Sequence, residues 1–375
     1  MAEFHPFLME RMMSKFEKKV DFNLSESGVH PVLLRDLLNL SSDKIEKFLS
    51  IELNYPHANG IPELREAVAS IYSHASKQNV LITVGAAEAN FICLQTLMAQ
   101  EGELVIMLPN YMQIWGIAKN FQIKVNPFYL KEENNWAPDL NQLEKVVNDN
   151  TRVIAVCNPN NPTGYILKDH EMDAIISIAD RVGAWILADE VYSGAERTTN
   201  KITPSFYGRY DKVLAVGSTS KAYGLPGLRI GWVVGPSEII EDVWARHEYT
   251  AISATMLSNY LGTIALSSDV RIKLLERARN YIRNGYDVFS EWVKSSDGIF
   301  NLVPPQASAV AFIKYDVDVN STAFVEKLVR ERRVFIVPGD NFNLDRFFRI
   351  SFGLPKEYLT QGLDRIQSLM LEYKK

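Results

Sequence analysis

The sequence has little of what membrane, secreted and nucleic-acid-binding proteins are rich in. Its 375 residues include two cysteines, Cys93 and Cys157, which provide neither a disulfide framework nor the spacing of a metal site. No apolar run approaches the ~18 residues of a membrane span. The net charge of −5 offers no positive excess to attract nucleic acid or an anionic membrane. We therefore predict a cytoplasmic protein that binds no metal, nucleic acid or membrane.

The N-terminal segment is amphipathic and does not resemble a targeting signal. Its apolar residues fall near helical spacing: Phe4, Phe7, Leu8, Met12 and Phe16. It lacks the charged-then-apolar layout and the small-residue cleavage site of a secretory signal. We predict an arm that packs on the protein's own body or on a partner subunit.

Short apolar runs alternate with amphipathic segments from about residue 62 to 235. The runs predict buried strands at 80–84, 104–108, 153–156, 185–188, 213–216 and 232–234. Between two of these runs, Met172, Ile175, Ile176 and Ala179 mark one face of a helix. This alternation predicts an α/β fold with a mostly parallel sheet that is covered by helices on both faces.

After about residue 267 the pattern changes to a smaller α+β unit. A long charged helix at about 270–293 precedes strands and helices of mixed order, with predicted strands at 309–313, 334–337 and 347–350. A length of 375 residues suits about two domains. We predict an N-terminal arm at 1–45 that joins the small domain, a large domain at 46–267, and a small C-terminal domain at 268–375.

Lys221 is the most informative residue, because it follows the apolar run 213–217 directly after three small hydroxyl residues, Ser218, Thr219 and Ser220. Most lysines are solvated surface charges, but one held at a strand end can have a lowered pKa and attack a carbonyl. This is how an aldehyde cofactor is bound as a Schiff base. The other strand ends should then carry the cofactor's remaining partners, since ligands of open α/β sheets bind at the carboxyl ends of the strands.

The first two strand ends carry weak signals. Gly85-Ala86-Ala87 follows the first strand and opens a helix, and such a turn exposes backbone N–H groups that suit a phosphate. Tyr111 follows the second strand and could stack on a planar ring. Either feature alone is more often a plain turn or a packed side chain.

The next two strand ends are more specific. Residues 158–164, Asn-Pro-Asn-Asn-Pro-Thr-Gly, predict a rigid turn in which Asn161 donates a hydrogen bond from a fixed position. Asp189 directly follows an apolar strand, where a carboxylate is costly unless a cation neutralises it. A protonated pyridine nitrogen is such a cation, and Tyr192 lies three residues on, within reach of the ring's phenolic oxygen.

The runs NPNNPTG (158–164), DEVY (189–192) and STSKAYGLPGLRIG (218–231), in this order, resemble those of fold-type I pyridoxal 5′-phosphate (PLP) aminotransferases. The class I/II, aspartate-aminotransferase-like group is the most similar, and the likeness covers essentially the whole chain. It implies a seven-stranded, mostly parallel sheet between helices and a smaller α+β domain.

The resemblance also implies a role for each matching residue. Lys221 would form the Schiff base, Asp189 would pair with the pyridine nitrogen, Tyr192 and Asn161 would hold the phenolic oxygen, and Tyr111 would stack on the ring. The phosphate would be held by Gly85, Ala86, Ala87, Ser218, Ser220 and Arg229.

Further residues match the family's substrate site and subunit interface. Arg349 matches the arginine that grips the substrate α-carboxylate, with Asn161, and a planar guanidinium suits that task. Ser27 and Gly28 lie in a turn that lines the substrate pocket in the family. Tyr55 matches the tyrosine that one subunit donates to its partner's phosphate site, so the resemblance implies a homodimer.

We therefore expect an enzyme that transfers the α-amino group of an L-amino acid to a 2-oxo acid by a ping-pong mechanism. A β-lyase (C–S lyase) or a decarboxylase on the same scaffold is the alternative, because a fold does not fix the reaction. Family members of the α-oxoamine synthase group carry histidine in place of Tyr111. A transcription regulator would need an appended DNA-binding domain, and only about 50 residues precede Tyr55, so we disfavour this alternative. A binding protein without activity is also disfavoured, because every residue that the chemistry needs is present.

The substrate is the least determined property. Ala87 stands where related aspartate aminotransferases often carry a lysine, which disfavours an acidic substrate. Glu26 replaces part of the family's Gly-x-Gly turn, and we hypothesise that it faces the side-chain pocket and repels acidic or attracts cationic substrates. A solvated glutamate at the pocket mouth is the plainer interpretation. Trp115 and Phe16 are candidates for an apolar pocket wall.

Overall fold

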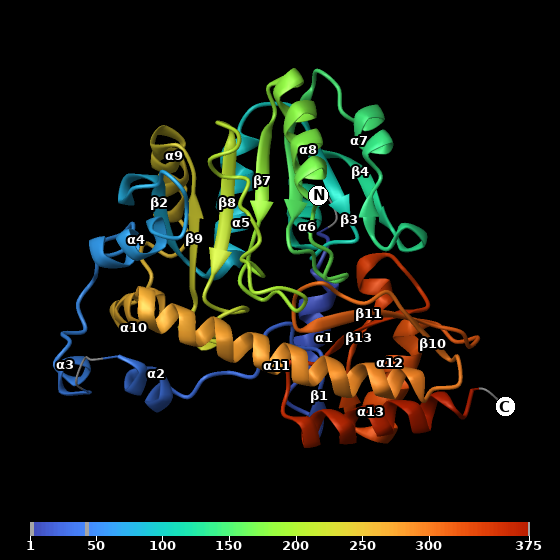
Figure 1. The fold of residues 1–375 in the computed structure, drawn as a ribbon. Coiled ribbons are helices and arrows are strands. Elements are labelled where there is room, and N and C mark those ends of the chain that lie inside the picture. The colour runs from blue at the N-terminus through green and yellow to red at the C-terminus, as the bar shows by residue number, and fades with distance from the viewer. Residues whose placement is uncertain (1–3, 42–44, 374–375) are drawn as a thin grey trace.

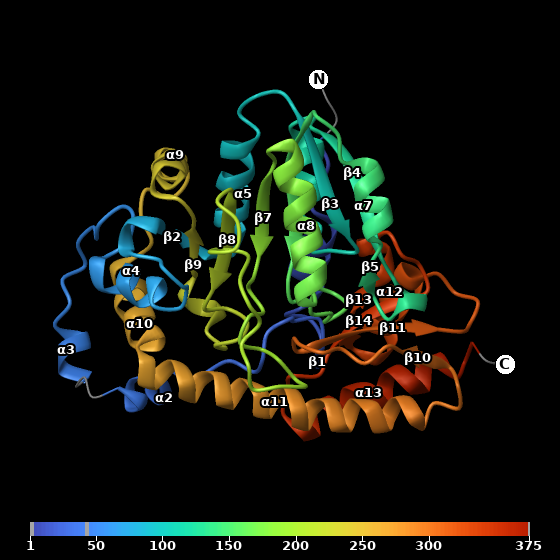
Figure 2. The ribbon, with the colours of Figure 1, turned by 45° about the horizontal axis from the view of Figure 1, so that its top comes forward.

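The computed structural model describes residues 4–41 and 45–373. A twisted eight-stranded sheet forms the upper part of the molecule, and a smaller α+β part lies beneath one end of it (Figures 1 and 2). Within the described ranges, no helix combines the length and the apolar composition needed to cross a membrane.

The central sheet has the strand order β2-β9-β8-β7-β6-β3-β4-β5. Neighbours from β8 to β4 are parallel, whereas β9 runs antiparallel to both β2 and β8, and β5 runs antiparallel to β4. The strands are β2 Val80–Val84, β3 Glu103–Leu108, β4 Lys124–Lys131, β5 Ala137–Pro138, β6 Thr151–Cys157, β7 Trp185–Asp189, β8 Val213–Ser218 and β9 Ile230–Val234. The mostly parallel sheet is as predicted, but it has one strand more than expected.

The extra strand and its neighbour lie at the sheet's edge, which explains why the sequence pattern missed them. β4 carries Asn126 and Pro127 and is only partly buried, so it shows no continuous apolar run. β5 has two residues and completes a short antiparallel pair with β4. Edge strands need little apolar surface, and a proline is tolerated there.

Helices cover both faces of the sheet because its strand residues alternate between two cores. Leu187 of β7 belongs to the core beneath α5, α6 and α9, whereas its neighbours Ile186 and Ala188 belong to the core on the opposite face, with α4, α8 and α10. The helices around the sheet are α4 Pro62–Ala69, α5 Gly85–Leu97, α6 Gln113–Asn120, α7 Leu140–Val146, α8 Asp169–Val182, α9 Ser237–His247 and α10 Met256–Leu266.

The C-terminal part is built on a four-stranded antiparallel sheet of order β10-β11-β14-β13. The helix α11, Ser268–Lys294, runs beneath the central sheet from α10 to this part (Figure 1). The remaining elements are β10 Phe300–Leu302, β11 Val310–Tyr315, α12 Ser321–Arg332, β12 Val334–Phe335, β13 Val337–Pro338, β14 Phe347–Ser351 and α13 Lys356–Met370. Short 3₁₀ helices lie at Lys77–Asn79, Glu132–Asn134, Pro226–Leu228 and Gly339–Phe342.

The N-terminal elements are α1 Leu8–Phe16, β1 Phe22–Asn23, α2 Leu34–Leu40 and α3 Ile45–Leu49. β1 pairs in parallel with β12, which attaches the arm to the C-terminal part. The predicted apolar stripe of α1 is partly wrong, because Leu8 is 61% exposed and Phe4 is also exposed, while Met9 and Met13 are buried. Phe7, Met12 and Phe16 do pack against the core.

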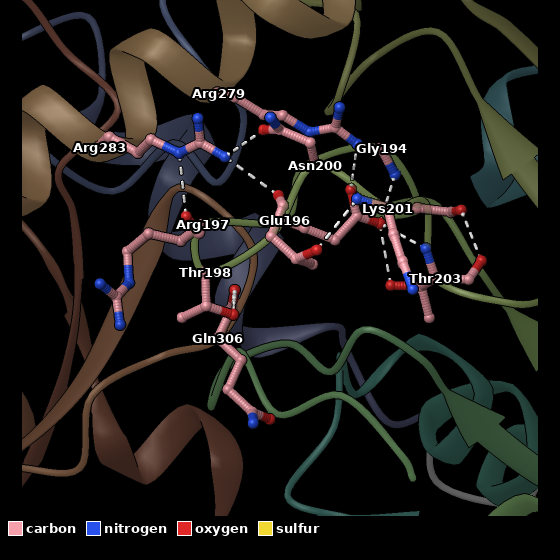
Figure 3. A network of polar contacts seen from close by, with 12 residues as sticks. Gly194, Glu196, Arg197, Thr198, Asn200, Lys201, Thr203, Arg279, Arg283 and Gln306 are labelled. Carbon is pink, nitrogen blue, oxygen red and sulfur yellow. Dashed lines mark hydrogen bonds and ion pairs between the residues drawn. The ribbon is translucent and has the colours of Figure 1, made fainter. Parts of the chain in front are cut away.

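A buried polar network holds α11 to the loop that follows β7 (Figure 3). Arg279 of α11 forms a buried ion pair with Glu196, with 2.7 Å between Nη2 and Oε2. Arg283 donates hydrogen bonds to the carbonyl oxygens of Arg197 and Thr199. The opposite carboxylate oxygen of Glu196 accepts from the backbone of Gly194 and Thr203, so both oxygens of this buried carboxylate are satisfied.

Candidate active site

The cavity at the carboxyl ends of the parallel strands contains most of the predicted site residues. It has a volume of about 410 Å³, and α1, the turn after β1 and β14 of the C-terminal part close it from the other sides. Twelve predicted residues line it: Ser27, Ala86, Ala87, Tyr111, Asn161, Asp189, Tyr192, Ser218, Ser220, Lys221, Arg229 and Arg349. Parallel strands all end at this edge of the sheet, so distant parts of the chain meet there.

Gly28 and Gly85 do not line the cavity but support residues that do. A Cβ on Gly28 would lie 3.1 Å from the carbonyl oxygen of Ser220 and 3.8 Å from Cδ of Lys221. Gly85 has a φ of +78°, and a Cβ there would lie 2.4 Å from Nη2 of Arg229. A side chain at Gly28 would therefore crowd the backbone of Ser220, and one at Gly85 would adopt a strained φ and displace the Arg229 guanidinium group.

Lys221 lies three residues beyond the end of β8, in the wall of the cavity. Burial lowers the pKa of its ammonium group, and the Glu26 carboxylate acts in the opposite direction. The positive charges of Arg349 and Arg229 add to the lowering. A lower pKa increases the share of the free amine, which is the form that acts as nucleophile and proton acceptor.

Asp189, at the end of β7, is fixed by two hydrogen bonds. Its Oδ2 accepts from Nδ2 of Asn90 at 2.9 Å, and its Oδ1 accepts from the backbone N–H of Val191 at 3.2 Å. Burial raises the pKa of Asp189, whereas the hydrogen bond from Asn90 and the charge of Lys221 lower it. A carboxylate in this position is stabilised by a cationic group in the cavity.

Three side chains of the cavity wall each have a buried polar atom with no hydrogen-bond partner among the described residues. They are Oη of Tyr192, Oδ1 of Asn90 and Nε of Arg349. All three side chains are nearly inaccessible, with exposures of about 1%. Because an unpaired buried polar atom typically costs ~1–3 kcal/mol, their clustering at one cavity indicates a polar ligand.

The helix α5 and the residues after β8 form an anion-binding end of the cavity. α5 begins at Gly85, so the backbone N–H groups of its first turn, including those of Ala86 and Ala87, have no partner within the helix. The Ser218 and Ser220 hydroxyls lie 2.9 Å apart, and the guanidinium group of Arg229 lies beside Gly85. Amide and hydroxyl donors, a helix N-terminus and a guanidinium suit a phosphate.

Arg349 projects from β14, so the C-terminal part contributes directly to the cavity. Its Nη1 donates to Oδ1 of Asn161 at 3.1 Å and its Nη2 to the carbonyl oxygen of Ser25 at 2.7 Å. These bonds fix the plane of the guanidinium group, and Nε is left unpartnered. A guanidinium group held in this way is suited to a carboxylate.

The cavity wall includes residues that the sequence did not indicate. They are Phe7, Glu10, Met13, Glu17, Asn90, Gln113, Cys157, Val191 and Pro226, while Glu26 lies there as hypothesised. Asn90 could have been found, because it lies one turn beyond Ala86 on the helix that begins at the proposed phosphate turn. Trp115 and Phe16 do not line the cavity: Phe16 packs on Phe335, and Lys119 lies over the Trp115 ring.

Tyr55 does not contribute to the cavity of its own chain. It is 81% exposed and lies in the segment between α3 and α4, outside the set of cavity residues. Its predicted contact with a phosphate therefore requires a second subunit.

Comparison with known proteins identifies the family. Residues 49–366 match the family of class I and II aminotransferases. The chain is 30% identical over 324 residues to an aspartate aminotransferase of Pyrococcus horikoshii, covering 84% of this chain and 83% of that protein. It is also 28% identical to a capreomycidine synthase of Streptomyces vinaceus, and the match covers 97% of this chain and 92% of that protein. The protein therefore belongs to the class I and II aminotransferase family.

A solved structure supports the same assignment. A PLP-dependent aminotransferase from Streptococcus suis has a TM-score of 0.93 and 29% identity, covering 100% of this chain and 99% of that one. The fold is thus that of a fold-type I PLP-dependent transaminase, as the sequence predicted. The residues present fit the cofactor, since the cavity offers a lysine with a lowered pKa, a buried carboxylate, an anion-binding end and unpartnered polar atoms.

Proposed function

We propose that the protein transfers the α-amino group of an L-amino acid to a 2-oxo acid by a ping-pong mechanism that uses Lys221 as the catalytic base. The observation that carries this proposal is one cavity that combines Lys221, Asp189 and Arg349. When bound, PLP supplies a carbonyl group that reacts with amines and a ring that accepts electrons. The protein supplies the binding, orientation and proton transfer.

The residues around the cavity divide this work. Asp189, fixed by Asn90 and by the Val191 N–H group, would hold the pyridine nitrogen. Tyr192 and Asn161 would hold the phenolic oxygen, and Tyr111 would stack on the ring. The phosphate would lie against Ala86, Ala87, Ser218, Ser220 and Arg229, with Gly85 providing the close approach.

Arg349 and Lys221 act on the substrate itself. We propose that Arg349 binds the α-carboxylate together with Asn161, near Ser27 and Gly28, because its guanidinium group is buried and already oriented. Lys221 lines the same cavity, so a substrate held at Arg349 would present its α-carbon to this lysine. Burial lowers the pKa of Lys221 and so favours its free amine, which would accept the α-proton of the substrate and later give it back.

A half-reaction screen tests the proposal. Single L-amino acids are added to the purified holoenzyme, and the absorbance is followed. We expect conversion of the PLP form to pyridoxamine phosphate for a subset of amino acids, and recovery when pyruvate or 2-oxoglutarate is added. Release of ammonia, pyruvate or carbon dioxide with the PLP absorbance unchanged would contradict transamination.

A β-lyase-type or decarboxylase reaction on the same scaffold is the second candidate. A fold does not fix the reaction, and a protein that is 28% identical across 97% of this chain is named as a synthase rather than an aminotransferase. The same screen separates the two candidates, because only transamination leaves the amino group on the cofactor.

We propose that the enzyme is a homodimer in which Tyr55 contacts the partner's phosphate site. Large apolar side chains are exposed around this residue and on a second segment, namely Leu33, Leu49, Leu53, Tyr55, Tyr249 and Ile252. A second subunit packed on these segments would remove these apolar side chains from water. We also propose a cytoplasmic location, since Cys93 and Cys157 are free, buried thiols.

Hybrid dimers test the donation of Tyr55. Tyr55→Ala and Lys221→Ala chains, each of low activity, are co-expressed with different affinity tags and isolated as mixed dimers. If Tyr55 is donated, one of the two sites has an intact Lys221 and receives an intact Tyr55, so we expect activity to return to about half of the wild-type value per dimer. Mixed dimers that stay as inactive as the Tyr55→Ala homodimer would show that Tyr55 acts within its own chain.

A further inference from the structure

Three glutamates line the part of the cavity that lies against the N-terminal arm. Glu10 belongs to α1, Glu17 follows its last residue, and Glu26 lies in the turn after β1. All three are half-buried. They come from the N-terminal segment, whereas the strand ends of the central sheet form another part of the lining. We call Glu10, Glu17 and Glu26 the acidic wall of the cavity.

These carboxylates are poorly compensated. Within residues 4–41 and 45–373, neither Glu10 nor Glu26 forms an ion pair, and Glu17 has only the exposed Lys18, at 3.6 Å. Glu10 accepts a hydrogen bond from the hydroxyl group of Tyr111 at 2.7 Å. Burial and the Glu10 charge raise the pKa of Tyr111, so this hydroxyl group remains the donor of the hydrogen bond.

The cationic groups of the cavity are not available to neutralise the acidic wall once ligands are bound. Under the proposed function, Arg229 holds the cofactor phosphate, Arg349 holds the substrate α-carboxylate and Lys221 reacts. Glu10 and Glu26 do lie close enough to Lys221 and Arg349 to affect their pKa values. Once phosphate and carboxylate are bound, however, the acidic wall faces the ligand without a cation of its own.

The unpartnered Nε of Arg349 is an independent sign that a ligand enters this cavity. Arg349 is 1% exposed and lies in the same cavity wall as Glu10 and Glu26. A ligand with its carboxylate at Arg349 therefore has the rest of its length between the strand ends and the acidic wall. A positive charge on that part would pair with the glutamates.

We propose that the preferred amino donor is an L-amino acid with a cationic side chain, a guanidinium or an ammonium group, recognised by Glu10 and Glu26. This inference rests on the proposed function and names its substrate class. It also excludes aspartate and glutamate as good donors, because a second carboxylate would meet like charges in a partly dehydrated cavity. Ala87 supports this exclusion, since it provides no cation for an acidic side chain.

Matched pairs of amino acids test the proposal on the wild-type holoenzyme. L-Arginine and L-citrulline have nearly the same shape but differ in charge, as do L-lysine and L-2-aminoheptanoic acid. We expect kcat/KM for the half-reaction to be at least about 10-fold higher for the charged member of one pair, the size of one hydrogen bond to a charged group. Equal rates within both pairs, or faster reaction of aspartate, would overturn the proposal.

Variants then assign the preference to residues. Glu26→Gln and Glu10→Gln keep the shape of each side chain and remove its charge. We expect each to lower kcat/KM for the charged amino acid about 10-fold, mainly through KM, while the neutral partner changes little. Glu238→Gln, in the exposed first turn of α9, is the control with no expected effect.

The two variants also distinguish recognition of a charged side chain from other roles of Glu10 and Glu26. If Glu10 only positions Tyr111, Glu10→Gln will slow both members of a pair equally, and the assignment to Glu10 fails. If Glu26 is only a solvated glutamate, Glu26→Gln will leave the charge preference intact. A screen in which no amino acid gives pyridoxamine phosphate would instead refute the proposed function itself.

Discussion

Replacement of Lys221 by alanine will abolish transamination, with a fall in kcat of about 10⁴-fold or more, because both the nucleophile and the general base are lost. Borohydride reduction followed by peptide mass spectrometry should fix the cofactor to Lys221 in the wild-type protein and leave the variant unmodified. Exchange of the substrate α-proton in deuterated water should also stop.

Lys212→Ala is the matched control. Lys221 follows β8, whereas Lys212 is an exposed residue that precedes it. The Nζ of Lys212 donates to the carbonyl oxygen of Gly183. This variant should retain activity and cofactor binding. Transamination at an undiminished rate in Lys221→Ala would show that another group accepts the α-proton.

Replacement of Arg349 is expected to have the second-largest effect. Arg349→Gln should lower kcat/KM for the best amino donor by about 10²–10³-fold, because truncation of a buried charge partner costs ~2–5 kcal/mol. Arg349→Lys keeps the charge but loses the planar, two-pronged geometry, so it should restore only part of the activity. Measurement of the half-reaction rate as a function of amino-acid concentration gives kcat and KM separately.

Arg346→Gln is the control for Arg349→Gln, because it removes one positive charge close to Arg349 in the sequence without changing the proposed carboxylate site. Arg346 directly precedes β14, but its side chain is half-exposed and pairs with Asp318. We expect wild-type kinetics from this variant. Cofactor absorbance and melting temperature should be measured for all three variants, since loss of Arg349 also leaves the carbonyl oxygen of Ser25 without its donor. Unchanged kcat/KM in a folded Arg349→Gln protein would remove Arg349 from the substrate site.

The central part of the site was predictable because it depends on local sequence and on one rule of topology. Asp189, Asn161 and Lys221 each follow a strand that an apolar run marks, and parallel strands end at the same edge of a sheet. A rigid Pro-containing turn, a carboxylate after a buried strand and a lysine among hydroxyl residues are recognisable without knowledge of distant contacts.

Other features depend on packing between distant segments and could not be predicted from local patterns. β4 and β5 lie at the sheet edge, where little burial is needed, so their residues show no strong pattern. The rotation of α1 that buries Met9 and exposes Leu8 depends on what the helix packs against. The same rotation places Glu10 at the Tyr111 hydroxyl.

The sequence by itself therefore determined the family, the fold class and the residues at the strand ends, because these follow from periodicity and short motifs. Only the tertiary structure placed Asn90 against Asp189 and the oriented Arg349 beside Asn161. It also brought the glutamates of the N-terminal arm to the opposite wall of the cavity. The physical reason is that these contacts join segments far apart in the chain, and their geometry is fixed by how helices and sheets pack.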